Sequence, residues 1–167
     1  YFNTSNIDLL TESKYANFLN KSGNFDLIIE DSRKGILDTL RVILKIYKNK
    51  YDLIIDLQNS NRTNYYWFLL KFFSKSKING SRSNCDIRYI IPLQGSESPQ
   101  KGLYNQLKLL GINEISDDLG WLLRNTDKII EDKLIMLIPG VSKSGKYKQW
   151  SSQKFAELAK ILEHRNF

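Results

Sequence analysis

The residues with the clearest chemical potential lie near the end of the chain, in a loop rich in glycine, serine and lysine. Residues 134–138 (LIMLI) form an apolar run before Pro139 and Gly140, and the loop then continues to Lys148 and Trp150. A helix-patterned segment, SSQKFAELAKIL, follows it. A strand that ends at a glycine, crosses such a loop and enters a helix is a common phosphate-binding arrangement. The pattern therefore predicts a phosphate site here.

Part of this loop is close to a P-loop. The stretch GVSKSGK, which runs from Gly140 to Lys146, matches the pattern up to its last position, where Tyr147 replaces the serine or threonine that binds magnesium. A phenol cannot replace that small hydroxyl, and a P-loop helix would begin at the lysine. The first good helix start is instead the pair Ser151-Ser152. A P-loop-like nucleotide-binding protein therefore remains only an alternative.

Strand and helix patterns alternate along the rest of the chain. The expected strands are residues 6–10, 25–30, 51–57, 77–79 and 134–138, and the expected helices are residues 14–19, 35–47, 59–73, 100–110 and a last one from 151. This alternation predicts an α/β fold, a Rossmann-like parallel sheet with helices on both faces. A polar stretch before Lys133 predicts a boundary between residues 1–132 and 133–167.

Two of these elements carry a specific packing prediction. Residues 51–57 (YDLIIDL) form a continuous apolar run between two aspartates, which suits a central strand buried on both faces. The helix over residues 35–47 should pack on the sheet through one apolar row, which comprises Ile36, Leu37, Leu40, Ile43, Leu44 and Tyr47.

The amino-acid composition narrows the possible functions less than the motifs do. The formal net charge of +7 suits an anionic partner, although it also favours plain solubility. Cys85 is the only cysteine and the chain has one histidine, which excludes an internal disulfide and a closed Cys/His zinc site. No apolar run is long enough to span a bilayer, and no signal peptide pattern opens the chain. We expect a cytoplasmic protein that is a piece of a longer polypeptide.

Four segments resemble one family. The segment YDLIIDLQNSNRT resembles the YDLxIDLQGxxRS turn of bacterial heptosyltransferases, which are lipopolysaccharide-building enzymes of glycosyltransferase family nine. The segment LIPGVSKSGKYKQWSSQKFAELAKIL resembles the opening of that family's second domain, with its Lys-x-Trp-Pro. The helix LYNQLKLLGI and the opening YFNTSNIDLLTESKY are also similar to family segments. The resemblance covers almost the whole chain in the right order.

The resemblance implies a fold and a reaction. It implies a GT-B fold, in which two Rossmann-like domains face each other across a cleft, and this chain would hold the first domain plus the first β-α unit of the second. The implied activity is inverting, metal-independent transfer of a heptose from an ADP-heptose-like nucleotide sugar to an anionic, lipid-linked saccharide of lipopolysaccharide type. It uses no cofactor. Such an enzyme would work in the cytoplasm, with possible peripheral contact at the inner face of the inner membrane.

The resemblance assigns donor-side residues in the loop described first. Lys148 matches the family lysine and would contact the donor phosphates, with hydrogen-bond donors from Ser142 and from the backbone around Gly140. An ammonium group and a hydroxyl after a glycine turn suit a departing diphosphate. Lys143 and Lys146 read as plain surface charge.

It also assigns acceptor-side residues to the turn after the central strand. These are Asp56, Gln58 and Arg62, of which Arg62 could meet an acidic acceptor group by a bidentate contact. Surface charge is an equal interpretation of Arg62, and Asp56 could simply cap the turn. Asn59 stands where the family has glycine, and asparagine tolerates positive φ better than most residues.

Catalysis itself is not assigned to this chain. The family's first strand and its Gly-Asp loop, with the presumed catalytic aspartate, are expected ahead of Tyr1, and most of the donor domain after Phe167. In addition, Ser151 replaces the proline after Trp150. We therefore expect the chain alone to be inactive.

A rival hypothesis is a basic nucleic-acid-binding module. Aromatic residues lie among lysines in one segment, namely Tyr65, Tyr66, Trp67, Phe72 and Phe73. Their helical spacing reads more simply as a face packed on the sheet, so no nucleic-acid partner is expected. A third interpretation places residues 67–73 on a membrane surface, which is compatible with the transferase hypothesis.

Overall fold

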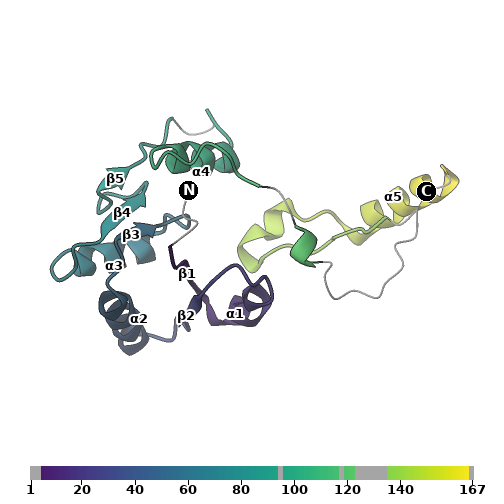
Figure 1. Ribbon diagram of the computed structural model, residues 1–167. Helices are drawn as coiled ribbons and strands as arrows, with labels where there is room; N and C mark the ends of the chain where they lie inside the picture. Colours follow the sequence, from purple (N-terminus) through teal and green to yellow (C-terminus); the bar gives the residue numbers. More distant parts are fainter. Residues whose placement is uncertain (1–4, 94–95, 117–118, 123–134, 166–167) are drawn as a thin grey trace. The chain divides into compact units, whose positions relative to one another are not determined.

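Short parallel strands alternate with helices in the computed structural model, which describes residues 5–93, 96–116, 119–122 and 135–165. The chain divides into two units, Tyr1–Arg124 and Asn125–Phe167, and each is described by itself below (Figure 1). The boundary expected between residues 132 and 133 falls in a segment outside the described residues.

The described residues of the first unit form two parallel sheets. Its elements are β1 (Asp8–Glu12), α1 (Ser13–Asn20), β2 (Leu27–Asp31), α2 (Ile36–Asn49), β3 (Leu53–Ile55), α3 (Asn61–Leu70), β4 (Lys77–Gly80), β5 (Ile87–Arg88), α4 (Pro99–Lys108) and η1 (Gly120–Leu122). Strand β1 pairs with β2, and the second sheet has the order β3-β4-β5. The expected α/β class is confirmed, with a β-α arrangement consistent with a Rossmann-like fold.

Local sequence explains where the helices begin and end. The Ser60 side chain accepts a hydrogen bond from the Thr63 N–H, while the Thr63 side chain accepts one from Ser60, so α3 starts with a capping box. Ser98 caps α4, whose first residue is Pro99. Gly111 follows α4 with a φ of 77°, as its place after the expected helix predicts.

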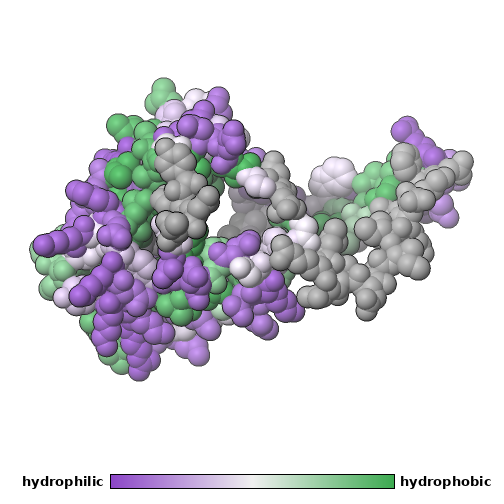
Figure 2. All heavy atoms as spheres, in the orientation of Figure 1, coloured by the Kyte–Doolittle hydropathy of each residue, from purple (hydrophilic) through white to green (hydrophobic). Residues whose placement is uncertain are grey.

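The core lies where α2 and α3 meet strands. Its buried residues are Ile29, Val42, Ile43, Ile46, Tyr66, Trp67, Leu70, Ile78 and Cys85. Burial raises the pKa of the Cys85 thiol. Hydrophobic side chains also remain visible among hydrophilic ones on the face shown in Figure 2.

The predicted buried row of α2 is wrong. Of its members only Ile43 is buried, whereas Ile36 and Leu37 are 80% and 72% exposed. The helix packs through a neighbouring row, which comprises Thr39, Val42, Ile43 and Ile46. Both rows have helical spacing, so periodicity cannot decide between them, and packing against β2 and α3 selects the second.

The prediction of a central strand at residues 51–57 is also wrong in two respects. The strand is shorter, Leu53–Ile55, and it is half-buried rather than buried on both faces. Its only described partner is β4, because its other edge borders a pocket. Nearby, α3 ends at Leu70, before the expected Phe73, and β5 lies in a segment expected to be a loop.

The described residues of the second unit form a 3-10 segment, η2 (Lys143–Lys148), and one helix, α5 (Ser152–His164). Ser151 caps α5 by accepting a hydrogen bond from the Lys154 N–H, which confirms the predicted start. Residues 135–138 do not form the expected strand, because no described strand lies beside them, and residue 134 is outside the described range. None of the described helices combines the length and the apolar character needed to cross a membrane.

Candidate functional site

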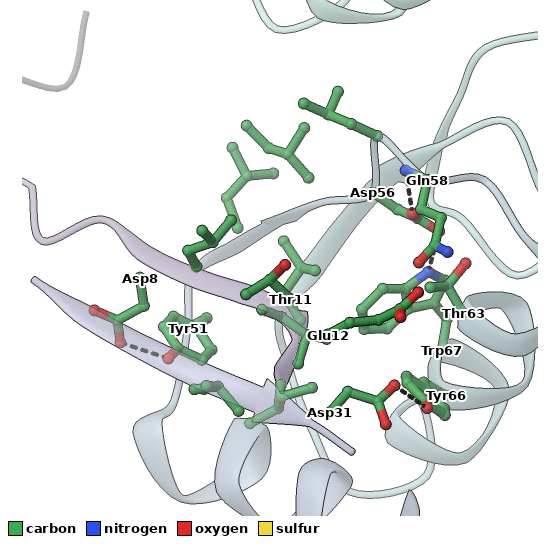
Figure 3. A pocket seen from close by; sticks show the side chains of 18 of the residues that line it. Asp8, Thr11, Glu12, Asp31, Tyr51, Asp56, Gln58, Thr63, Tyr66 and Trp67 are labelled. Carbon is green, nitrogen blue, oxygen red and sulfur yellow. Dashed lines mark hydrogen bonds between the residues drawn. The ribbon is translucent and has the colours of Figure 1, made fainter. Parts of the chain in front are cut away.

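A pocket of about 250 Å³ opens in the first unit between β1 and β3. Apolar residues of both strands line its inner part, and polar residues gather where the strands end, as Figure 3 shows. The polar lining residues include Glu12, Asp31, Arg33, Asp56 and Gln58. Open α/β sheets bind ligands at the carboxyl ends of their strands, so this end of the pocket is the candidate site.

Asp56 organises the turn that follows β3. One carboxylate oxygen, Oδ1, accepts hydrogen bonds from the backbone N–H groups of Gln58 and Asn59, at 3.0 and 2.9 Å. The other, Oδ2, accepts one from the indole N–H of Trp67 at 2.7 Å. Asp56 is buried, so its carboxylate holds the turn rather than facing solvent. Asn59 has a φ of 50°, the conformation expected where the family has glycine.

A buried amide network supports the same turn from behind. The Gln106 Nε2 donates to the backbone oxygen of Asp56 at 3.0 Å and to the Asn79 Oδ1 at 2.9 Å. Its Oε1 accepts from the Asn59 Nδ2 at 2.8 Å. Sequence reasoning missed this network. Its signal was the polar Gln106 in an otherwise apolar helical row with Leu103 and Leu107.

Arg62 makes its bidentate contact within the chain. Its Nε and one terminal nitrogen donate to the two carboxylate oxygens of Asp31, at 3.1 and 2.9 Å. The Tyr66 hydroxyl donates to Asp31 as well, at 2.7 Å. Burial by itself would raise the pKa of Asp31, but the hydrogen bonds from Arg62 and Tyr66 outweigh it and lower that pKa. Burial and the Asp31 carboxylate raise the pKa of Tyr66 to about 12.

Asp31 was not among the candidates from the sequence. It ends β2, whereas Arg62 begins the helix after β3, so this ion pair joins segments far apart in the chain. Beside it, Arg33 pairs with Glu12 at 2.5 Å. Gln58 lines the same opening with an exposed side chain. Asp56 and Gln58 thus line the same pocket. Arg62 does not line it, but its ion-pair partner Asp31 does.

The donor-side residues lie in the second unit. Gly140, Ser142 and Lys148 are all exposed. A side chain added at Gly140 would meet nothing within 4 Å, so a ligand can approach the backbone there closely. The Lys148 Nζ lies 5.4 Å from the centre of the Tyr147 ring. The ring of Trp150 packs against Phe155 at 5.8 Å, which is a packing role for this tryptophan.

The helix after this loop begins at Ser152 rather than at Lys146, which differs from a P-loop. Within the described residues, no group of acidic, histidine or cysteine side chains could hold a metal ion.

Comparisons with models of protein families, with curated proteins and with solved structures found no match for this chain.

Proposed function

We propose that this chain is part of an inverting, metal-independent glycosyltransferase. The full polypeptide would move a heptose from an ADP-heptose-like donor to an anionic saccharide of lipopolysaccharide type. The basis for this reaction, and for heptose as the sugar, is the resemblance of the sequence motifs to the heptosyltransferases.

The observation that carries the proposal is the polar cluster where β1, β2 and β3 end. Ligands of open α/β sheets bind at that end, and the turn DLQNSNR that resembles the heptosyltransferase motif lies there. A preformed turn with an exposed amide suits recognition of sugar hydroxyls, because its geometry is set before the ligand arrives.

The contacts within the chain divide the roles of the three acceptor-side residues. Asp56 and Arg62 act as positioning residues, because their charged groups are held by the turn and by Asp31. Gln58 is the proposed direct contact to the acceptor, since its side chain is exposed at the opening.

On the donor side, Lys148 offsets the charge of the diphosphate while the Ser142 hydroxyl and the amides after Gly140 donate hydrogen bonds to it. Within this loop, the Gly145 N–H donates a hydrogen bond to the backbone oxygen of Ser142, at 2.9 Å. An arrangement of this kind stabilises a leaving diphosphate without a metal ion.

The test uses the full-length polypeptide and ADP-heptose. Removing the Lys148 charge (Lys148→Ala) should weaken donor binding about tenfold, which corresponds to one lost charge-assisted contact. The matched control is Lys146→Ala, because both lysines are exposed in η2. Calorimetry with ADP-heptose, and with ADP alone, measures the dissociation constants.

Equal affinities of the Lys148→Ala and Lys146→Ala variants would remove Lys148 from the donor site. If the full-length protein binds neither ADP-heptose nor ADP, the transferase proposal fails.

The structure leaves fewer aromatic rings for base stacking than the rival nucleic-acid hypothesis assumes. Two of its five aromatic residues, Tyr66 and Trp67, are buried in the core. Three members are exposed, and of these Phe72 and Phe73 form a ring cluster with Phe68, next to Lys71, while Tyr65 is the third. Exposed aromatic rings beside lysines favour contact with an anionic membrane surface, where the lipid-linked acceptor would be found.

A further inference from the structure

Helix α2 has a second apolar row beside the one that packs in the core. The buried row contacts β2 and α3. The members of the second row are between 45% and 72% exposed, and they are Leu37, Leu40, Leu44 and Tyr47. They follow one another at spacings of three and four residues, so they share one face of the helix. Ile36, which is 80% exposed, extends this row at the start of the helix.

A row of cations runs beside the exposed apolar row. Arg41 lies one helical turn after Leu37, and Lys48 lies one turn after Leu44, so each of these cations adjoins an apolar side chain. Leu44 also lines a groove of about 300 Å³ together with Arg41, Lys45 and Lys48. Apolar and basic side chains therefore lie next to each other on the exposed surface of α2.

Most of the positive charge in this segment has no partner. Residues 34–50 contain one carboxylate, Asp38, and five exposed cations, which are Lys34, Arg41, Lys45, Lys48 and Lys50. The Asp38 carboxylate pairs with Arg41 at 3.2 Å. No described carboxylate forms an ion pair with Lys45 or Lys48. The segment therefore favours a negatively charged partner.

The same charges argue against a second copy of this chain as the partner. In a two-fold symmetric contact the exposed row would face itself, and the cations of both copies would lie beside each other. Like charges placed together in an interface weaken it. A bilayer with anionic lipids has the opposite charge at its surface and an apolar layer below, so it matches both the basic and the apolar row of α2.

A second patch of the same chemistry favours a membrane over an acidic protein. The exposed rings of Phe72 and Phe73 follow α3 and lie next to Lys71. Helix α3 packs against α2 in the first unit (Figure 1). A bilayer offers the same anionic headgroups and apolar layer at every point, whereas an acidic protein would need a separate complementary site for each patch.

We propose that α2 lies on the surface of an anionic membrane, with its exposed apolar row inserted between the lipids. Leu37, Leu40 and Leu44 enter the apolar layer, while Lys45 and Lys48 extend to the lipid headgroups. At 14 residues the helix is too short to span a bilayer, so it lies along the surface. The proposal rests on the exposure and charge of α2 and does not depend on which reaction the protein catalyses.

Co-sedimentation of the full-length polypeptide with vesicles of phosphatidylcholine and phosphatidylglycerol tests the apolar row. The double substitution Leu37→Ser and Leu44→Ser should weaken binding about tenfold, because it removes two apolar side chains from the lipid layer. The matched control is Ile90→Ser with Leu93→Ser, which changes two exposed apolar residues outside α2 and should bind as the wild type does.

A pair of lysine variants tests the basic row. Lys45→Gln with Lys48→Gln should weaken binding to the same vesicles about tenfold, because each lysine near an anionic surface contributes to the attraction. The control, Lys101→Gln with Lys108→Gln, removes the same charge from α4 and should have a smaller effect, since salt screens charges more than about 10 Å from the surface. Equal losses in the two variants would overturn the role of the basic row.

A fluorescent label measures insertion directly. Cys85 is buried, so a nitrobenzoxadiazole dye can be attached to an exposed cysteine introduced elsewhere. With the dye on Leu44→Cys, the emission should shift to the blue when vesicles bind, because the dye enters the apolar layer. With the dye on Ile90→Cys, it should stay unshifted.

Three further results would overturn the proposal. The first is equal vesicle binding of the Leu37→Ser, Leu44→Ser variant and its control. The second is an unshifted label on Leu44→Cys in the presence of anionic vesicles. The third is self-association that Leu37→Ser and Leu44→Ser abolish in analytical ultracentrifugation, which would identify a second copy as the partner. None of these measurements involves a sugar nucleotide, so this proposal and the transferase proposal can fail separately.

Discussion

At the scale of single residues, Asp31 carries the most strongly connected charge in the described part of the chain. It is buried, and it receives hydrogen bonds from Arg62 and Tyr66. Replacing it by asparagine (Asp31→Asn) leaves the guanidinium without its carboxylate. We expect the free energy of unfolding to fall by about 1.5–3 kcal/mol at pH 7. Urea unfolding measures this, with Asp52→Asn at an exposed position as the control.

The pH dependence of that difference follows from the sign of the pKa shift. The pKa of Asp31 is lowered from 3.8 on folding, so its stabilisation is fully present above that value and is lost as the pH falls below it. The gap between the wild type and Asp31→Asn should therefore narrow as the pH falls from about 5 to 3. A gap that stays constant over this range would show that the lost stability does not come from the carboxylate charge.

Gln106 gives a second prediction at this scale. The substitution Gln106→Leu keeps a side chain of similar length but removes the acceptor of the Asn59 Nδ2 and the Gln106 donor to the buried Asn79 Oδ1. This should lower the free energy of unfolding by about 1–3 kcal/mol. Gln100→Leu, on an exposed position of the same helix, is the control. Equal stability of the two variants in thermal or urea unfolding would contradict the proposed importance of the network.

The residues also show what could be predicted from the sequence. The positive φ of Asn59 and the cap at Ser151 depend on local chemistry, and both were predicted correctly. The pair Asp31–Arg62 and the contacts of Gln106 join residues far apart in the chain, where a single sequence offers no pairing signal. Local geometry was therefore predictable, whereas the partners of charged and amide groups were not.

At the scale of elements, existence and type were predicted better than packing. In the first unit, α1 to α4 and β1 to β4 lie close to their expected positions. The short helix η1 is the exception. The helix α2 is apolar on more than one side, so its spacing allowed two buried rows, and the tertiary contacts chose the unexpected one. The expected strand at residues 134–138 failed for a related reason, because an apolar run forms a strand only beside another strand.

The end of α3 carries the prediction that belongs to this scale. Phe72 and Phe73 are each 67% exposed, and Lys71 lies beside them. We expect the double substitution Phe72→Ser and Phe73→Ser to weaken binding to vesicles of phosphatidylcholine and phosphatidylglycerol about tenfold, because it removes apolar surface from the membrane interface. Co-sedimentation measures the bound fraction.

The matched control for this surface is Ile90→Ser, which removes an exposed apolar side chain away from α3. Equal loss of vesicle binding in both variants would mean that the exposed rings of Phe72 and Phe73 do not form the contact. Binding that is unchanged in the double variant and lost at high salt would point to charge alone.

At the scale of the whole first unit, the two sheets are held beside each other by side chains rather than by a strand ladder. The hydrogen bond from Tyr51 to Asp8 joins their amino-terminal ends, and the contacts of Asp31 join their carboxyl-terminal ends. The apolar residues of β3 line the pocket between these ties, so the apolar segment at residues 51–57 predicted a central strand although β4 is the only described strand that pairs with β3.

The Tyr51 tie can be tested through its pKa. Burial and the hydrogen bond to Asp8 raise the pKa of Tyr51 from 10.0 to about 12. A raised pKa means that the stabilisation is complete below pH 10 and is lost as the pH rises through about 12. We expect Tyr51→Phe to lower the free energy of unfolding by about 1 kcal/mol at pH 8, and this difference to shrink by pH 12. Urea unfolding at several pH values measures it, with Tyr47→Phe at an exposed position of α2 as the control. Equal effects of Tyr51→Phe and Tyr47→Phe would mean that this hydrogen bond does not hold the two sheets together.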